Sequence, residues 1–223
     1  MDKNSKTKRL LSLTNILIFL GLFFIFLSFG PLIKDEIWFY IMELRSQKYS
    51  LEEGKVIKSP FGRLLTSTPI RIEPINKDFS IVIERIGVNA PIVKDVSVAN
   101  EQAYREALKS GIAHALVSDY PSKEAGNVYL FAHASLNFFE LGKYSTVFNL
   151  LRKLSYGDRV NIFYETDRYI YEVAHKEVVK GWDLRPLNRP TIEPLLTLQT
   201  CDPPGTTLNR FVVTAKLIEV EEN

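Results

Sequence analysis

The sequence predicts an all-β domain with short helices, a barrel or a sandwich, behind a single N-terminal membrane-spanning helix. Three observations support this prediction. About seven or eight short segments beyond residue 78 have strand-like patterns, no regular strand–helix alternation joins them, and one long uncharged apolar run occupies residues 10–33. Residues 78–223 are enough to enclose one hydrophobic core.

The apolar run is predicted to be an uncleaved membrane anchor. At about 1.5 Å per residue, a helix over residues 10–33 crosses a hydrocarbon core of roughly 30 Å. The run is long for a signal peptide, and no small-x-small cleavage site follows it. Four basic side chains in residues 1–9 precede the span, which predicts a cytoplasmic tail and an extracellular remainder.

Residues 34–77 connect the anchor to the domain. An apolar face that includes Trp38 predicts a juxtamembrane helix over residues 35–54. Three prolines and one glycine between residues 55 and 77 then favour an extended stalk, or a segment wrapped around the domain. Whether residues 55–77 act as a lid over a groove stays open.

The remaining residues, 78–223, form the predicted catalytic domain. Alternation and bounding turn residues predict strands at 79–83, 86–93, 128–132, 160–164, 169–179, 195–201 and 211–215. Short helices are predicted at 100–109 and 147–154. A long loop over residues 182–194 precedes the last two strands.

Three reactive side chains stand at ends of these strands. Cys201, the only cysteine, ends one strand, Arg210 begins the next, and His133 closes an earlier one. A nucleophilic cysteine needs a thiolate or a nearby base, and acyl transfer needs a donor for the oxyanion. Together the three could supply nucleophile, proton shuttle and charge stabilisation. Taken singly, each also has an ordinary structural explanation, such as a small buried thiol.

Residues 197–201, Thr-Leu-Gln-Thr-Cys, resemble the Thr-Leu-x-Thr-Cys signature of the sortases, which are cysteine transpeptidases of the bacterial cell surface. The family's order of motifs fits from about Ser80 to Glu219. It includes a Gly-x-x-His segment at Gly111–His114 and a strand ending at Ala132–His133, where the family usually has glycine before the histidine. The resemblance implies a closed eight-stranded sortase-type β-barrel.

The resemblance also implies a reaction. Cys201 would attack the threonine carbonyl of a Leu-Pro-x-Thr-Gly-like sorting signal, Arg210 would hold the oxyanion or the substrate backbone, and His133 would protonate the departing amine. The acyl group would then pass to an amine of the cell wall or of another surface protein. Without an Asp-Pro-aromatic lid before the barrel, the chain is more similar to protein-anchoring sortases of Gram-positive bacteria than to pilin polymerases.

Four further residues are candidates for substrate binding. Thr200 could position the thiol or the substrate through its hydroxyl, or be an ordinary β-branched strand residue. Trp182 and Leu184 lie in the loop that forms one wall of the signal groove in sortases, although this loop could equally pack down as a lid. The resemblance makes His114 a second histidine that is either structural or close to the substrate.

The expected partners are the membrane, surface proteins with a C-terminal sorting signal, and an amine acceptor. The chain carries 28 Lys and Arg against 26 Asp and Glu. This nearly even balance does not indicate a nucleic-acid partner. No cofactor or metal is predicted, and calcium, on which some relatives depend, can be assigned no acidic cluster. Two alternatives stay open: a cell-wall cysteine peptidase or amidase, and a non-catalytic membrane-tethered module in which Cys201 is structural.

Overall fold

The computed structural model describes residues 3–51, 69–97, 100–133, 143–144 and 146–222. Its helical elements are α1 (Lys3–Leu44), η1 (Glu84–Ile86), α3 (Glu101–Ser110) and η3 (Leu151–Lys153). A short parallel pair joins β1 (Tyr49–Ser50) and β2 (Ile70–Arg71). The other strands are β3 (Phe79–Ile83), β4 (Val88–Val96), β5 (Ile112–Ala115), β6 (Gly126–Phe131), β7 (Arg159–Tyr164), β8 (Asp167–Lys180), β9 (Pro194–Asp202) and β10 (Asn209–Glu221).

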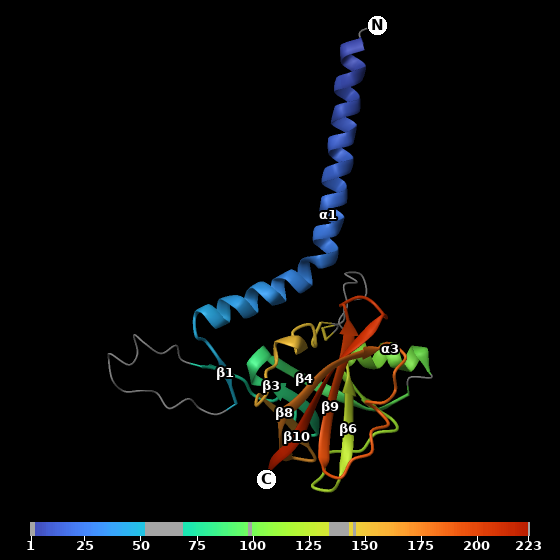
Figure 1. Ribbon diagram of the computed structural model, residues 1–223. Coiled ribbons are helices and arrows are strands. Elements are labelled where there is room, and N and C mark those ends of the chain that lie inside the picture. The colour runs from blue at the N-terminus through green and yellow to red at the C-terminus, as the bar shows by residue number, and fades with distance from the viewer. Residues whose placement is uncertain (1–2, 52–68, 98–99, 134–142, 145, 223) are drawn as a thin grey trace, which may run out of the picture.

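These eight longer strands close into a barrel in the order β10-β8-β7-β3-β4-β5-β6-β9 (Figure 1). Most neighbours are antiparallel, but β4 pairs with β5 and β6 pairs with β9 in parallel. A parallel pair needs a crossover connection, which α3 supplies between β4 and β5. The all-β barrel with few short helices is therefore confirmed.

Two local predictions differ from the structure. Residues 112–115 form β5, although no strand was predicted there, and all four are buried. The helix predicted over residues 147–154 is instead a series of turns and the 3₁₀ helix η3. Phe148, Leu151 and Leu154 are all buried at intervals of three residues, which suits the three-residue turn of a 3₁₀ helix better than the α-helical period.

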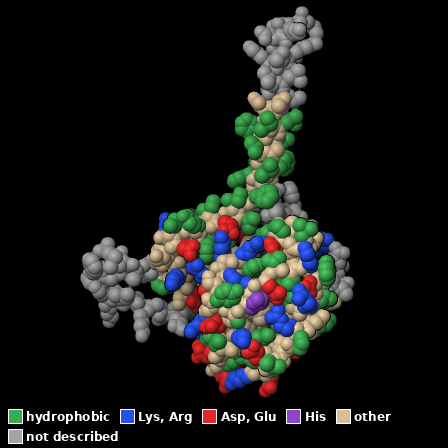
Figure 2. Space-filling model, viewed as in Figure 1, with side chains coloured by type: hydrophobic (Ala, Val, Ile, Leu, Met, Phe, Trp, Pro, Cys, Tyr) green, Lys and Arg blue, Asp and Glu red, His purple; other side chains and the backbone are tan. Residues whose placement is uncertain are grey.

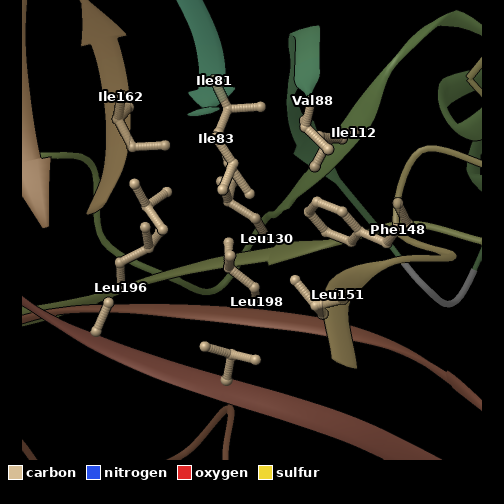
Figure 3. Packing of buried hydrophobic residues seen from close by; sticks show 14 of the residues in the cluster. Ile81, Ile83, Val88, Ile112, Leu130, Phe148, Leu151, Ile162, Leu196 and Leu198 are labelled. Carbon is tan, nitrogen blue, oxygen red and sulfur yellow. The ribbon is translucent and has the colours of Figure 1, made fainter. Parts of the chain in front are cut away.

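Inward-facing side chains fill the barrel (Figure 3). Leu196 and Leu198 of β9 and Leu130 of β6 lie in this core and are fully buried. Because side chains alternate along a strand, their neighbours Gln199 and Cys201 face outward. A second, smaller cluster covers part of the outside, where α3 packs against β4, β5 and β6.

Helix α1 extends away from the barrel and bends before its C-terminal part reaches it (Figure 1). Pro31 lies within α1, and a proline inside a helix removes a backbone hydrogen bond and bends it. Hydrophobic side chains line the extended part (Figure 2). Among the residues that the structure describes, no helix has the length and apolar character needed to cross a membrane. The span predicted over residues 10–33 stays a prediction.

The C-terminal part of α1 docks on the barrel. Phe39 packs against the core, Glu43 pairs with Arg85 at 2.9 Å, and Glu36 pairs with Lys153 at 2.7 Å. The juxtamembrane helix predicted over residues 35–54 therefore ends earlier, at Leu44, and the chain then turns into β1. Most of the predicted stalk, residues 52–68, lies outside the described residues, so its possible role as a lid stays a prediction.

Candidate active site

Cys201 and Arg210 lie directly opposite each other on adjacent antiparallel strands, β9 and β10. Directly paired residues point to the same face, with their Cβ atoms roughly 5 Å apart. The thiol is a free cysteine and is partly exposed, as is the arginine. The guanidinium donates one hydrogen bond to the carbonyl oxygen of Asn209 at 3.1 Å. Both residues were predicted to stand at strand ends, and their pairing places the thiol beside a positive charge.

His133 follows directly after β6, which runs parallel to β9. The Ala132 amide donates to the Gln199 carbonyl oxygen at 3.1 Å, and the Thr200 hydroxyl donates to the Ala132 carbonyl oxygen at 3.1 Å. These two bonds hold the backbone before His133 against the backbone before Cys201. Since Ala132 belongs to the inner core, alternation turns His133 outward, to the face of Cys201.

Thr200 itself faces the barrel interior and is buried. Its hydroxyl is used by Ala132, so the structure gives it a backbone contact and not an exposed place on the Cys201 face. Its predicted role in positioning the thiol or the substrate stays a prediction. The bond joins the two strands that carry the imidazole and the thiol.

Tyr104 of α3 lies beside all three reactive groups, and the sequence analysis did not single it out. Its ring is 5.9 Å from the His133 ring, centroid to centroid, at 89°. Burial raises the pKa of its hydroxyl, the nearby Cys201 raises this pKa further, and Arg210 opposes the rise. Its spacing from Ala107 and Leu108 on the same helix face was the available signal, but that spacing does not say what the face covers.

Tyr129 and Gln199 form a polar pair on the outer face next to Cys201. The Tyr129 hydroxyl is 2.5 Å from the Gln199 side-chain oxygen, to which it donates a hydrogen bond. Burial raises the pKa of Tyr129 strongly, although Arg210 and Arg189 act against the rise. Tyr129 therefore stays protonated and holds the amide of Gln199 in one orientation.

The rim of the barrel, formed here by the end of β9 after Cys201 and the loop between β9 and β10, is held by close contacts. Asp202 is buried and forms an ion pair with Arg152, whose guanidinium lies 5.5 Å from the centre of the Phe211 ring. Across the rim, a Cβ atom added at Gly181 would lie 2.1 Å from the carbonyl oxygen of Thr207. This approach requires glycine and brings the end of β8 against the loop between β9 and β10.

The loop between β8 and β9 is fastened to the outer face at two points. Asn127 donates to the Pro186 carbonyl oxygen at 3.0 Å and accepts from the Thr197 hydroxyl at 2.7 Å. Arg189 donates to the Thr214 hydroxyl and to Glu177, both at 2.9 Å. The middle of the loop is therefore packed onto the barrel.

Trp182 and Leu184, in the first part of this loop, project into solvent with 81% and 60% of their surface exposed. They line a hollow of about 790 Å³ together with His175 and Glu177 of β8. Among the described residues, Cys201 does not contribute to the lining of this hollow. The structure thus leaves both side chains available to a partner, and their substrate contact stays a prediction.

His114 lies on the inner side of the wall and is fully buried. Its Nε2 atom is 3.0 Å from the Asp119 carbonyl oxygen and 3.1 Å from the Ser118 hydroxyl. Its ring centroid is 4.6 Å from that of Tyr120 and 5.6 Å from that of Phe79. The structure does not bring His114 to the Cys201 face, and these contacts fit the structural alternative.

Within the described part of the chain, no three His, Cys, Asp or Glu side chains come together as a metal ion would require. The described acids near the site are instead paired with cations, as Asp202 is with Arg152. The expectation that the site needs no cofactor or calcium stays a prediction.

A thiol and a guanidinium on paired strand ends, with an imidazole just beyond the end of the adjacent strand, are groups that a cysteine acyltransferase would use. The family model for the sortase domain matches residues 81–218. The chain therefore belongs to the sortase family, and its enzyme class is that of the cysteine transpeptidases. None of the curated proteins matches the chain.

Solved sortase structures share the fold. A Clostridium perfringens sortase D5 transpeptidase is 27% identical, with 66% of this chain and 82% of that chain covered and a TM-score of 0.52. Sortase C-1 from Actinomyces oris is 25% identical over 65% of this chain and 76% of its own, with a TM-score of 0.53. A Clostridium perfringens sortase C, 22% identical over 63% and 69%, has a TM-score of 0.52.

Proposed function

We propose that this sortase cleaves a Leu-Pro-x-Thr-Gly-like sorting signal after its threonine and joins the acyl group to an amine of the cell wall or of another surface protein. The observation that carries the proposal is the pairing of Cys201 with Arg210 across β9 and β10. This pairing supports the proposal because it brings a thiol and a guanidinium to one face, and acyl transfer requires a nucleophile and an oxyanion donor close together.

In the first half-reaction, the Cys201 thiolate attacks the threonine carbonyl carbon. Arg210 donates hydrogen bonds to the oxygen that becomes negative, and the imidazolium of His133 gives its proton to the departing glycine amine. The peptide bond breaks and a thioester forms between threonine and Cys201. The parallel pairing of β6 with β9 supports this assignment, because it ends both strands at the same rim.

In the second half-reaction, an acceptor amine attacks the thioester carbonyl. Neutral His133 takes a proton from the amine, Arg210 again holds the oxyanion, and the Cys201 thiolate leaves. An amide replaces the original amide, so neither reduction nor oxidation occurs. Water as the acceptor would release a free carboxylate, which makes hydrolysis the side reaction of this site.

The substrate class is supported by a structural neighbour. The structure of the Clostridium perfringens sortase C is described as one with the C-terminal cell wall sorting motif. We propose the same kind of client here, with Trp182 and Leu184 as candidates for contacting the apolar residues of the signal because both are exposed. The absence of an Asp-Pro-aromatic tripeptide from residues 34–77 supports protein anchoring over pilin polymerisation.

We also propose that the enzyme is a single-pass protein of the cell membrane, with its N-terminus in the cytoplasm and its barrel outside. The support is the uncharged run over residues 10–33 and the four basic side chains before it. We expect detergent to extract the full chain from membranes, and we expect high salt and alkaline carbonate to leave it there. Release by carbonate would contradict the anchor.

The transpeptidation proposal is tested with the full chain in detergent, a Leu-Pro-x-Thr-Gly peptide library and an amine acceptor, read by mass spectrometry. A threonine-linked amine product is expected from the wild type and from Lys180→Ala, an exposed substitution on β8. No product is expected from Cys201→Ala. A product formed by Cys201→Ala would contradict the cysteine mechanism. Cleavage of a cell-wall peptide, without cleavage of the sorting-signal peptides, would favour the peptidase or amidase alternative.

A further inference from the structure

Helix α3 carries one aromatic side chain into the site. The helix starts at the cap residue Asn100, whose side chain accepts a hydrogen bond from the Ala103 amide at 3.0 Å. Ala107 and Leu108 bury the helix against the barrel. Tyr104 lies one turn before them and packs against the same cluster. Its position is therefore set by the helix and not by a loop.

The Tyr104 ring contacts both Phe131, the last residue of β6, and His133 just beyond it. It stacks on Phe131, with centroids 5.6 Å apart and an angle of 13° between the rings. It meets His133 nearly at a right angle, with centroids 5.9 Å apart. Aromatic pairs favour stacked and edge-to-face arrangements at about 4.5–7 Å, so both contacts have the favoured geometry.

The orientation of His133 is restricted by this contact. The backbone bonds at Ala132 fix where the residue lies, and the second side-chain torsion of histidine is intrinsically broad. A ring packed edge-to-face with the imidazole narrows this rotation. A side chain from α3 therefore contributes to how the imidazole meets the substrate amine.

The Tyr104 hydroxyl responds to the charges of the site. Burial raises the pKa of Tyr104 above its ordinary value of 10.0, the nearby Cys201 raises it further, and Arg210 lowers it. The ring is therefore neutral at neutral pH. It can orient His133 without adding a charge to the site.

We propose that Tyr104 is a positioning residue that holds the His133 ring in the orientation needed to pass a proton to and from the substrate amine. This inference rests on the proposed function, because it assumes that His133 is the acid and base of the reaction. The role is assigned to the aromatic ring, since both direct contacts of Tyr104 are ring contacts.

The test compares Tyr104→Leu, which removes the ring, with Tyr104→Phe, which keeps it. Tyr156→Leu, which removes an exposed tyrosine near Lys176, is the matched control. In Tyr104→Leu we expect kcat for transpeptidation to fall about 10- to 100-fold, with KM within about twofold because substrate binding is kept. Tyr104→Phe and the control should keep the wild-type kcat.

A second readout does not depend on activity. The chain has three histidines, so the imidazole proton signals in an NMR spectrum of the full chain can be assigned by single substitutions. Loss of the neighbouring ring should move the His133 signal in Tyr104→Leu and leave those of His114 and His175 in place. Tyr104→Phe should keep all three. If Tyr104→Leu does not fold, Tyr104→Met, with a flexible side chain, is measured in its place.

Two results would overturn the inference. One is a folded Tyr104→Leu or Tyr104→Met with wild-type kcat and an unmoved His133 signal. The other is a Tyr104→Phe variant as impaired as Tyr104→Leu, which would assign the role to the hydroxyl. Both results can be told apart from failure of the proposed function, which would be recognised by product formation in the Cys201→Ala variant. The NMR comparison holds in either case.

Discussion

His114 and His133 belong to neighbouring strands, yet their side chains lie on opposite sides of the barrel wall. His114 is fully buried, with its Nε2 atom bonded to Ser118 and Asp119. His133 is partly exposed and meets Tyr104 on the face of Cys201. The two side chains face opposite sides of the wall because successive side chains along a strand point to opposite faces. The comparison teaches that an imidazole can exchange protons with a substrate only on the outer face, whereas the inner one stabilises the fold.

The largest effect is expected from removing the outer imidazole. In His133→Ala, kcat/KM for transpeptidation should fall about 10²- to 10⁴-fold, because positioned acid–base catalysis contributes that much. Its melting temperature should stay close to that of the wild type, since the side chain is outside the core. His175→Ala, which changes an exposed histidine of β8, should have full activity. An active His133→Ala enzyme would break the comparison on its functional side.

Removing the inner imidazole should have the opposite profile. His114→Leu removes the buried ring nitrogen that contacts the Asp119 carbonyl oxygen and the Ser118 hydroxyl, while Ser118 keeps its hydrogen bonds to Ala115 and Tyr129. We expect the free energy of unfolding to fall by about 1–3 kcal/mol, measured by denaturant titration. The folded fraction should keep the wild-type kcat. A stable but inactive His114→Leu variant would show that this histidine contributes to the reaction.

A smaller effect is expected at the bond that joins the two strands of the site. Thr200→Val keeps the shape and removes the hydroxyl that donates to Ala132. Loss of this bond should cost about 1 kcal/mol of stability. It should also lower kcat, because the backbone before His133 is released. Measured stability and kcat that both equal the wild type would mean that the remaining ladder bonds suffice.

The smallest effect is confined to high pH and concerns Tyr120, the neighbour of His114. Burial, with a hydrogen bond to Asp95, raises the pKa of this tyrosine from 10.0 to about 12. The folded state therefore keeps the phenol protonated where the unfolded chain ionises it. This contribution is complete below pH 10 and is lost as the pH rises through 12. Stability should fall less steeply over this interval in Tyr120→Phe, and an unchanged slope would contradict the assignment.

The sequence predicted what local patterns determine. Alternation located most of the strands and placed Cys201 and Arg210 at strand ends, and the resemblance to sortases implied that these strands are adjacent, as they are. The strand over residues 112–115 was missed because all four of its residues are buried, so no polar alternation exists to reveal it.

The other omissions depend on contacts between distant residues. The Thr200 bond to Ala132 follows from the register of a parallel pair, which no local pattern contains. Tyr104 was not predicted because helical spacing places it on a face without naming the strand beneath. For the same reason, the sequence could propose Trp182 as a groove residue but could not tell that Arg189 fastens the loop beyond it.

The parallel pairing of β6 with β9 has a consequence for how the enzyme comes into being. The hydrogen bond between Thr200 and Ala132 joins residues 68 positions apart, and pairings of such long range are expected to form late in folding. Arg210 reaches Cys201 through the local pairing of β9 with β10, whereas His133 joins them only when β6 pairs with β9. Reactivity is therefore an outcome of barrel closure, and a chain that fails to close leaves the thiol without the imidazole.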